Sequence, residues 1–417
     1  MRRVRVAAMW LRGLPGGLIG HGQLAATVPL EARANFRRDL VHAALTGVFV
    51  GVINNYFTVV ARRLGASEIV LAFILAGPFV GSLLSVLSPY LLNVANPTRR
   101  IAALWGLGRL LWVGALFVGA PAPYAAMVVA FQIVASIPAP GYAAVMQRAY
   151  PAAMRGRLLG ASRTAMAVLS LAVTPAAGPL MDRFGFGPVF ALAGVAGALG
   201  AVAFARIQPP GVTPSSPRNP LRLVRTAARV PGFFAYAIAY NLFLLGVIVM
   251  APAIPVVLVN TFDASFTTVG ALTLAQGIAW AFGFTGWGRV IDRTSGPFAS
   301  WAITFVHALV PVVFVTAILI GNVWLLLVAY VAQGVSLAGM ELGWQTSLMS
   351  MAPPEQTSSL ATTFFVLIGV RGLVGVFAGG LVLLAGGPYW AFGVSLALIA
   401  LGNVLMGRVV RRFVPAR

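Results

Sequence analysis

The sequence predicts an all-α membrane protein with twelve transmembrane helices, arranged as two six-helix bundles related by a pseudo-two-fold repeat, with both termini in the cytoplasm. Three observations lead to this fold class. Long apolar stretches alternate with clusters of Pro, Gly and Arg. The arginines fall almost entirely on one of the two sides that these stretches define. The two halves of the chain also repeat each other at an offset of about 200 residues.

The composition indicates that the bilayer is the solvent for most of the chain. Of the 417 residues, 59% are hydrophobic and 9% are charged, whereas a soluble domain carries about 25% charged residues. The absence of cysteine excludes disulfides, thiolate metal sites and a cysteine nucleophile. A net charge of +21 can indicate nucleic-acid binding. Here the arginines lie between apolar runs and no nucleic-acid motif is present, so we expect no nucleic-acid partner.

Each predicted span holds about the 20 apolar residues that are needed to cross the hydrocarbon core. The first half of the chain has spans at 38–61, 67–93, 100–119, 122–147, 157–181 and 187–206. The second half has spans at 230–260, 265–291, 297–319, 322–350, 357–384 and 388–410. Pro252 and Pro255 should kink the outer half of the span 230–260, because proline removes a backbone hydrogen-bond donor.

These spans divide the chain into five segments. They are a cytoplasmic tail (1–35), an N-terminal six-helix bundle (36–206), a cytoplasmic connector (207–229), a C-terminal six-helix bundle (230–412) and a second tail (413–417). With the N-terminus in the cytoplasm, 23 arginines fall on cytoplasmic segments, 3 on outside loops and 3 within spans. This asymmetry follows the positive-inside rule. We therefore expect a multi-pass protein of the plasma membrane, and specifically of a bacterial inner membrane.

Turn residues recur at matching places in the two halves. Ala66 and Ser67 open the second span, and Ala264 and Ser265 open the eighth, at an offset of 198. The Gly-Pro pairs at 187–188 and 387–388 open the sixth and twelfth spans at an offset of 200. A two-fold repeat of this kind builds a path between two bundles of helices.

The six-plus-six spans, the basic connector and a short motif together resemble the major facilitator superfamily of membrane transporters, over about residues 36–412. The family's motif has the form Gly-x-x-x-Asp-Arg/Lys on the cytoplasmic side, and this chain has it from Gly288 to Arg293, with Asp292 as the acid. The resemblance implies that the motif locks the halves in one access state. Gly288, Asp292 and Arg293 are therefore gating candidates.

Two other places depart from this motif or repeat it. After the second span the chain reads Pro-Tyr-Leu-Leu-Asn at 89–93, so Asn93, a fourth gating candidate, replaces the acid. A similar element ends the fifth span on the opposite side, from Gly178 and Pro179 to Asp182 and Arg183. Its Gly-Pro pair resembles the family's antiporter signature. The fourth span lacks the arginine that many proton-coupled drug exporters of the family carry there.

Ionisable residues inside spans are costly, so each is a functional candidate. Arg109 and His307 lie at matching depths in the third and ninth spans, which the resemblance places outside the central path. We expect them to tie helices through hydrogen bonds or to form a relay. Arg163 lies near the inner end of the fifth span, from which it can reach the cytoplasmic surface, and Arg371 lies in the middle of the eleventh. Both are candidates for the path.

Glu341 is the carboxylate that lies well inside a span. It shares one helix face with Gln333 and Gln345, because these residues recur at multiples of four. The resemblance places this tenth span along the central path. Two roles remain open for Glu341. It either carries protons or forms a fixed pair with Arg371 on the next helix.

Neutral polar residues complete the predicted path. They occur on spans that the resemblance places around the path and on the eighth span, and they are Asn54, Asn55, Gln132, Tyr240, Asn241 and Gln276. Amide and aromatic groups can bind a solute by hydrogen bonding and stacking. The same groups also serve helix–helix packing, so either role is open for each residue.

The leading functional hypothesis is a secondary active transporter that moves a small organic solute by alternating access, with possible coupling to protons. The excess of arginine over glutamate inside the spans favours an anionic or polar organic substrate. The alternatives are a multidrug efflux antiporter and a non-transporting membrane receptor or assembly factor on the same scaffold. No catalytic constellation or metal-ligand spacing occurs in the sequence. We therefore expect a protein that is not an enzyme and has no cofactor and no metal. We also expect it to be a monomer in the lipid bilayer.

Overall fold

The computed structural model describes residues 30–84, 96–151, 154–208, 227–351 and 354–413. Almost all of these residues are helical. In the first half of the chain the helices are α3 (Leu30–Arg63), α4 (Glu68–Leu84), α6 (Pro97–Leu110), η2 (Leu111–Leu116), α7 (Pro121–Ser136), α8 (Ala139–Ala149), α9 (Arg155–Phe184) and α10 (Phe186–Ala205). In the second half they are α12 (Phe233–Val249), α13 (Ala253–Val256), η3 (Val257–Thr261), α14 (Phe266–Arg293), α15 (Gly296–Ile320), η4 (Val323–Leu325), α16 (Leu326–Met351) and α17 (Pro354–Phe413).

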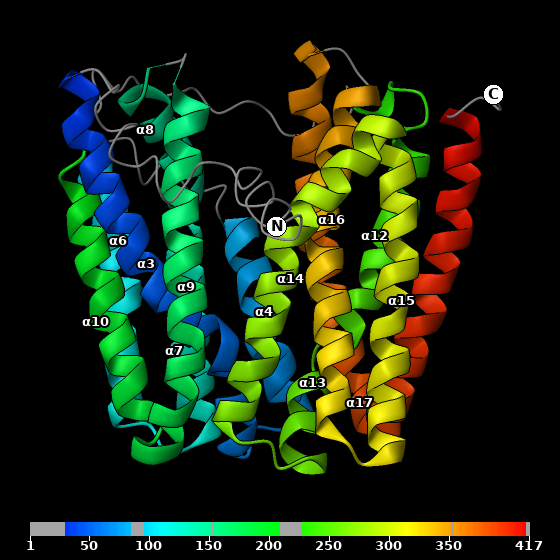
Figure 1. The fold of residues 1–417 in the computed structure, drawn as a ribbon, viewed down its shortest axis with the longest axis horizontal. Helices are drawn as coiled ribbons and strands as arrows, with labels where there is room; N and C mark the ends of the chain where they lie inside the picture. Colours follow the sequence, from blue (N-terminus) through cyan, green and yellow to red (C-terminus); the bar gives the residue numbers. More distant parts are fainter. Residues whose placement is uncertain (1–29, 85–95, 152–153, 209–226, 352–353, 414–417) are drawn as a thin grey trace, which may run out of the picture.

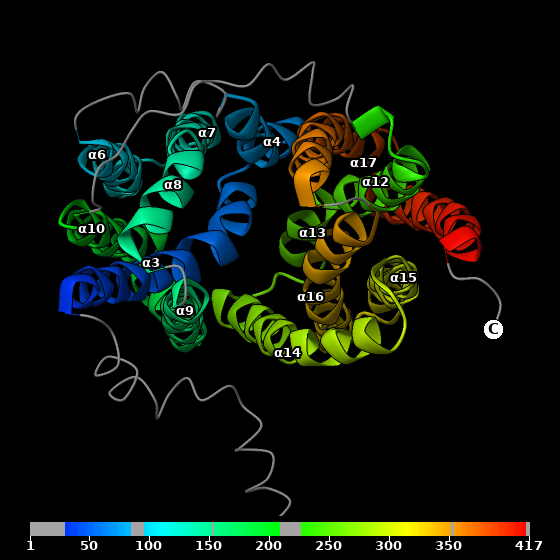
Figure 2. The same ribbon diagram turned by 90° about the horizontal axis from the view of Figure 1, so that it is seen from above.

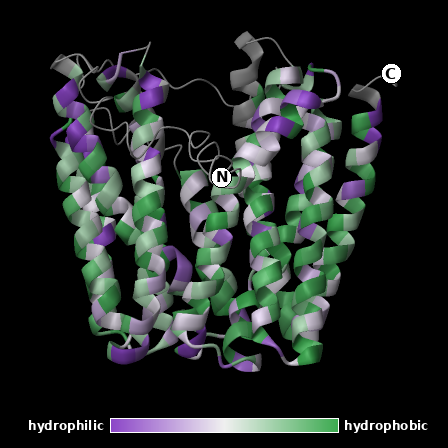
Figure 3. Cartoon of the chain, in the orientation of Figure 1, coloured by the Kyte–Doolittle hydropathy of each residue, from purple (hydrophilic) through white to green (hydrophobic). Residues whose placement is uncertain are grey.

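The described helices match the apolar stretches of the sequence. Eight of them are long and apolar enough to cross a membrane, and α4 and α7 are shorter apolar helices. Figure 3 shows apolar residues along most of the helix lengths, with hydrophilic residues gathered towards the two ends. The chain is therefore an all-α protein with several helices of membrane-spanning length.

Proline and glycine divide the longer helical segments. The region 122–147 consists of α7 and α8, and Pro138 immediately precedes α8. The region 230–260 has the break predicted from Pro252 and Pro255, since α12 stops at Val249 and is followed by the short α13 and the π-helical η3. The last two predicted spans form the single segment α17, which changes direction at Gly387 with a φ of 70°.

The first long helix begins earlier than the sequence suggested. Residues 30–35, which we assigned to the tail, form the first turns of α3. The start of α3 is fixed to the chain after α10, because the Asn35 side chain donates to the Gln208 carbonyl and accepts from the Gln208 amide, both at 3.0 Å. Arg38 Nη1 also donates to the Arg206 carbonyl. The rest of the predicted tail, most of the connector and Asn93 lie outside the described residues.

The helices pack mainly with others from their own half. In the first half, α3 packs on α9 and α10, α10 packs on α6, and α4 packs on α7. In the second half, α12 packs on α17, and α16 packs on α14 and α15. The two halves meet along two seams, α4 against α17 and α9 against α14 (Figures 1 and 2).

The apolar core joins the halves at one end of the molecule. We call the end where α10 stops and α12 starts the connector end, at the top of Figure 1, and the end where α3 stops and α14 starts the distal end. One buried cluster contains residues of both halves, among them Tyr56, Met181, Val257 and Phe266. The two other clusters belong to one half each, 32–207 and 227–410. The halves thus share a core towards the distal end and have separate cores elsewhere.

Candidate functional site

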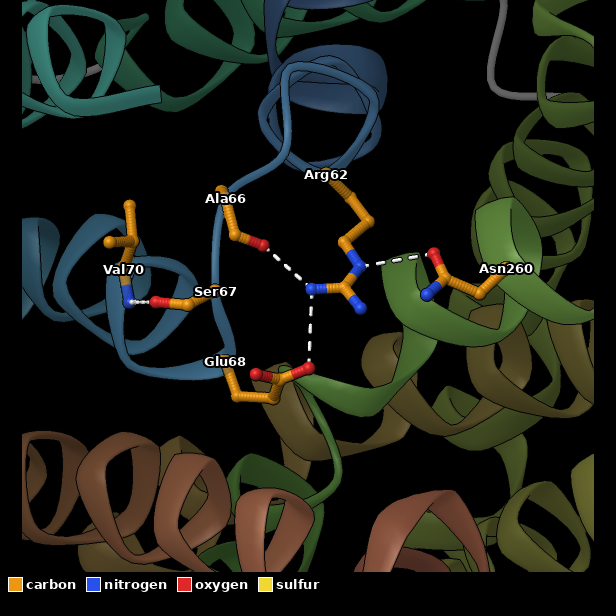
Figure 4. A network of polar contacts seen from close by, with 6 residues as sticks. All are labelled: Arg62, Ala66, Ser67, Glu68, Val70 and Asn260. Carbon is orange, nitrogen blue, oxygen red and sulfur yellow. Dashed lines mark hydrogen bonds and ion pairs between the residues drawn. The ribbon is translucent and has the colours of Figure 1, made fainter. Parts of the chain in front are cut away.

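At the distal end, Arg62 connects the two halves of the molecule (Figure 4). Its Nη1 forms an ion pair with Glu68 Oε1 at 3.2 Å and donates to the Ala66 carbonyl at 2.7 Å. Its Nε donates to Asn260 Oδ1 in η3, at 3.1 Å. The pair with Glu68 holds the guanidinium in place, so that its Nε–H group stays directed at Asn260 in the second half.

The next residue, Arg63, makes a second connection. Its Nη2 donates to the Ala264 carbonyl, in the turn that precedes α14. Its guanidinium lies over the Phe266 ring, 3.8 Å from the ring centre. A cation over an aromatic face contributes about 0.5–2 kcal/mol, depending on how far it is desolvated. The last turn of α3 therefore contacts both the chain before α14 and the first turn of α14.

Asp182, in the last turn of α9, binds the first turn of α14. Its Oδ1 accepts from the Phe266 amide at 2.9 Å, and its Oδ2 accepts from the Thr267 amide at 2.9 Å and from Thr267 Oγ1 at 2.7 Å. The first amides of a helix have no partner inside the helix and form the positive end of its dipole. The side chain of Ser265 caps the Thr268 amide at 3.0 Å. Asp182 thus supplies from the other half the acceptors that the start of α14 still needs.

A glycine allows α9 and α14 to approach closely beside Asp182. A Cβ at Gly178 would lie 2.7 Å from the Phe266 carbonyl oxygen and 2.8 Å from Thr267 Cα. These are backbone atoms, which cannot rotate away as the end of a side chain can. One turn earlier on α9, the Thr174 carbonyl accepts from the Tyr56 hydroxyl at 2.8 Å. The Gly-Pro pair that stood out in the sequence therefore lies where the backbones of α9 and α14 approach closely.

The predicted gating residues lie at the connector end. Asp292 and Arg293 are exposed in the last turn of α14, and Gly288 is half-buried. Within the described residues, Asp292 forms no ion pair. The hydrogen bonds assigned above between the two halves lie at the distal end instead. In this state the described hydrogen bonds between the halves involve Arg62, Arg63 and Asp182 and not Asp292.

Glu341 is exposed on α16 and is not paired with Arg371. Arg371 Nη1 donates to Asn241 Oδ1 on α12 at 2.9 Å. Asn241 in turn donates to the Ala237 carbonyl in its own helix at 2.8 Å. Arg163, which is exposed on α9 in the other half, acts on Glu341 electrostatically but forms no ion pair with it among the described residues. The structure therefore pairs Arg371 with Asn241 and not with Glu341.

Several predicted path residues serve packing in this structure. Tyr240 is fully buried, and its hydroxyl donates to the Met340 carbonyl at 3.0 Å. Asn55 donates to the Gly51 carbonyl at 3.0 Å and to Thr174 Oγ1 at 2.9 Å. Gln132 is buried on α7 beside Gly77 of α4. These three residues fix helix–helix contacts in the state described.

The remaining path candidates keep accessible surface. Asn54 is exposed on α3, and Gln276, Gln333 and Gln345 are half-buried. Gln276 and Gln333 come from the packed pair α14 and α16, where the Gln276 carbonyl approaches Gly334 closely. These side chains keep accessible surface, and they stay candidates for the path.

Arg109 and His307 occupy equivalent places but have different surroundings. Arg109 Nη1 donates to the Gly197 carbonyl at 2.7 Å, which joins α6 to α10. His307 is fully buried on α15 with the edge of the Phe243 ring beside it, 5.9 Å between centres. Neither ring nitrogen of His307 has a hydrogen-bond partner within the described residues. The helix tie expected of both residues is thus present for Arg109 and absent for His307.

Sequence reasoning missed a polar cluster near the connector end of the first half. It centres on Asp39 and His42 of α3, both buried, with Tyr150 and Ser162 as hydrogen-bond partners of the Asp39 carboxylate. Asp39 follows Arg37 and Arg38, which made it look like the edge of a solvated tail. The spacing of Asp39, His42 and Thr46 places the three residues on one helix face and could have revealed the cluster. No group of three or more potential metal ligands occurs among the described residues.

Neither a family model nor a curated protein matches the sequence of this chain. Solved structures do match its fold. A bacterial homologue of the human lysosomal transporter Spinster, inward-facing and unoccupied, superposes with a TM-score of 0.69 at 12% identity, covering 93% of this chain and 100% of that one. A point mutant of the nucleoside transporter NupG gives a TM-score of 0.67 at 11% identity, covering 90% of this chain and 100% of that one.

The Spinster homologue in its inward-facing, occupied form also matches, with a TM-score of 0.62 at 11% identity. It covers 91% of this chain and 98% of that one. The matches therefore extend over nearly the whole length of each protein. At such low identity the matches establish the fold alone. The chain shares its fold with these solved transporter structures.

Proposed function

We propose that this protein is a secondary active transporter that moves a small organic solute by alternating access. The observation that carries the proposal is the asymmetry between the two ends of the molecule. The distal end has a core shared by both halves and hydrogen bonds between them, whereas the clusters nearer the connector end are confined to one half each. Such a molecule is closed at one end and can open at the other.

The distal contacts are weak enough to break when the molecule changes from one state to the other. Asp182 is exposed and binds backbone amides, so water can replace it at moderate cost. A capping interaction of this kind contributes about 1 kcal/mol. Arg62 and Arg63 add surface contacts of similar size. A few such contacts hold one state without preventing the change to the other.

The connector end is the cytoplasmic end in this proposal, because most of the arginines gather there. The structure then represents a state that is open to the cytoplasm. The fold neighbour with the TM-score of 0.69 was itself captured in an inward-facing conformation. We accordingly propose that the protein is a monomer in a bacterial inner membrane with both termini in the cytoplasm. The two six-helix bundles are the units that move relative to each other.

Coupling to protons is assigned to Glu341. Its carboxylate is accessible, and the charge of Arg163 reaches it from the other half. Loss or gain of a proton at Glu341 changes the attraction between α16 and α9, and with it the balance between open and closed states. Arg371 does not neutralise the charge of Glu341 in a fixed pair, because it bonds to Asn241 instead.

A labelling experiment tests the proposal without knowledge of the substrate. The chain has no cysteine, so Asn54→Cys introduces a single thiol. Asn54 is exposed on α3, nine residues before the distal contact at Arg63. We expect a membrane-impermeant maleimide to label Asn54→Cys from the cytoplasmic side of inverted vesicles. Labelling that occurs from neither side in any condition would contradict a path that passes Asn54.

A further inference from the structure

Besides the path between the halves, the first half encloses a cavity of its own. The cavity has a volume of about 260 Å³ and lies between α3, α6, α8 and α9. Its polar lining consists of Asp39, His42, Thr46, Trp105, Arg109, Tyr142, Ser162 and Arg163. Ligand pockets usually measure about 300–1,000 Å³, so this one suits a small metabolite. None of the path candidates on α14 or α16 contributes to it.

The cavity presents two cations, and neither forms an ion pair within the described residues. Arg109 is 8% exposed and forms one hydrogen bond, to the Gly197 carbonyl. It also lies 5.6 Å from the ring centres of Phe49 and Trp105. Arg163 lies 5.4 Å from the centre of the Tyr142 ring. The Arg109 guanidinium is buried and arginine cannot discharge itself by losing a proton, whereas Arg163 is exposed at the edge of the cavity.

Asp39, which lines the same cavity, has one free acceptor. Its carboxylate is buried, and the hydroxyls of Tyr150 and Ser162 both donate to Oδ2, at 2.7 and 2.6 Å. Oδ1 is buried and has no partner. A buried acceptor without a donor costs free energy of about 1–3 kcal/mol. A bound molecule with a single hydroxyl group would relieve that cost.

The remaining lining residues fit the same ligand. His42 Nδ1 lies 2.9 Å from the Gly200 carbonyl and must donate to it, because a carbonyl only accepts. The imidazole is stacked on Trp105, with ring centres 5.5 Å apart and planes at 10°. With two arginines and one aspartate, the charged lining has a net charge of +1 when Asp39 is ionised and His42 is neutral. The charge of the lining therefore matches that of a monoanion, and the free acceptor of Asp39 matches a hydrogen-bond donor on the same ligand.

From this arrangement we propose that the cavity binds a small hydroxy acid as its monoanion, with the carboxylate at Arg109 and Arg163 and the hydroxyl donating to Asp39 Oδ1. An ammonium group suits the Asp39 position less well, because it would bring several donors to one free oxygen. Arginine is well matched to a carboxylate, which it can bind through two parallel hydrogen bonds. The proposal deepens the proposed function by naming a solute class, but binding can be measured without transport.

Three small molecules that differ by one group test the proposal on purified protein by titration calorimetry. Lactate has both the carboxylate and the hydroxyl, propionate lacks the hydroxyl, and alanine has an ammonium in its place. We expect lactate to bind at least tenfold more tightly than propionate or alanine. Equal affinity for lactate and propionate, or no binding of lactate, would overturn the assignment.

Variants identify the groups that bind the probe. Arg163→Gln, an exposed position, should weaken lactate binding at least tenfold, and Arg109→Gln should do the same. Arg411→Gln, which removes the same charge from the exposed end of α17, should leave affinity unchanged. Asp39→Asn should reduce the preference for lactate over propionate. The one oxygen of asparagine is needed by Tyr150 and Ser162, so no acceptor is left for the hydroxyl of lactate. If Arg163→Gln binds lactate as the unaltered protein does, the cavity is not the site.

Binding and alternating access can fail separately. Lactate binding is measured in detergent and does not depend on movement of the halves. Cysteine labelling at Asn54 does not depend on a ligand in the cavity. Loss of lactate binding with normal labelling would remove the hydroxy acid site and leave the transporter proposal in place. The reverse result would leave a binding site on a scaffold that does not open.

Discussion

Asp182 at the end of α9 accepts hydrogen bonds from both the amide and the hydroxyl of Thr267 at the start of α14, at 2.9 and 2.7 Å. The two residues are 85 positions apart and belong to different halves of the chain. This contact places a negative charge on the positive end of a helix dipole. Because it joins the halves at one end, it relates a local cap to the access state that we propose for the molecule.

The close approach at Gly178 can be tested by adding one methyl group. Gly178→Ala places a Cβ less than 3 Å from backbone atoms of Phe266 and Thr267, so α14 must move away from α9. We expect the closed distal state to be destabilised by about 1–3 kcal/mol, as for overpacking in a core. Faster labelling of a distal-end cysteine by a maleimide applied from outside would report this change.

Gly160 on the same helix provides the matched control. A Cβ there meets nothing within 4 Å. Gly160→Ala should therefore leave distal labelling unchanged and raise thermal stability slightly, because alanine is favoured over glycine inside a helix by about 1 kcal/mol. If the two alanine variants label alike, the approach at Gly178 does not control closure.

The motif at the connector end should act in the opposite direction. Asp292 is exposed and forms no ion pair within the described residues, as expected if its gating contact exists only when that end is closed. Asp292→Asn should then favour the state described here, with more labelling of Asn54→Cys from the cytoplasmic side. Unaltered or reduced labelling from that side would remove Asp292 from the gating mechanism.

Glu341 is tested by separating accumulation from exchange. In proteoliposomes, Glu341→Gln should abolish accumulation of the solute against its gradient under an imposed proton gradient, because glutamine cannot carry a proton. Exchange of the same solute across the membrane should persist, since the path is intact. Glu341→Asp keeps a carboxylate and should retain part of the accumulation. Normal accumulation by Glu341→Gln would mean that protons are carried elsewhere or not at all.

The sequence predicted the helical architecture well because hydrophobic length and proline position act locally. The break near Pro252 and the element around Asp182 were visible along the chain, whereas the break near Pro138, which divides the predicted span 122–147, was not predicted. The partners of these residues were not visible. Asp182 bonds to residues 84 and 85 positions away, and Asp39 to residues 111 and 123 positions away. The hydrophobic periodicity of a sequence does not indicate contacts between residues so far apart.

Proximity along the chain was also misleading in one place. Glu341 and Arg371 lie on consecutive helices, which suggested a pair, but Arg371 bonds to Asn241 from a helix 130 positions away. Asp39 was overlooked because two arginines precede it, and a charged run at a span edge resembles a solvated tail. Burial, which sets the importance of a charged residue in a membrane, became apparent only when the helices were packed.

The central claim is that the contacts of Asp182 hold the distal end closed, and a distance measurement tests it most directly. Spin labels at Phe184→Cys and Ile320→Cys report the distal end from exposed positions in the two halves, and labels at Arg157→Cys and Arg411→Cys report the connector end. Loss of about 1 kcal/mol should change the ratio of states about fivefold. We predict that Asp182→Ala moves the distal pair to longer distances and the connector pair to shorter ones. Distance distributions that are identical with and without Asp182 at both ends would contradict the account.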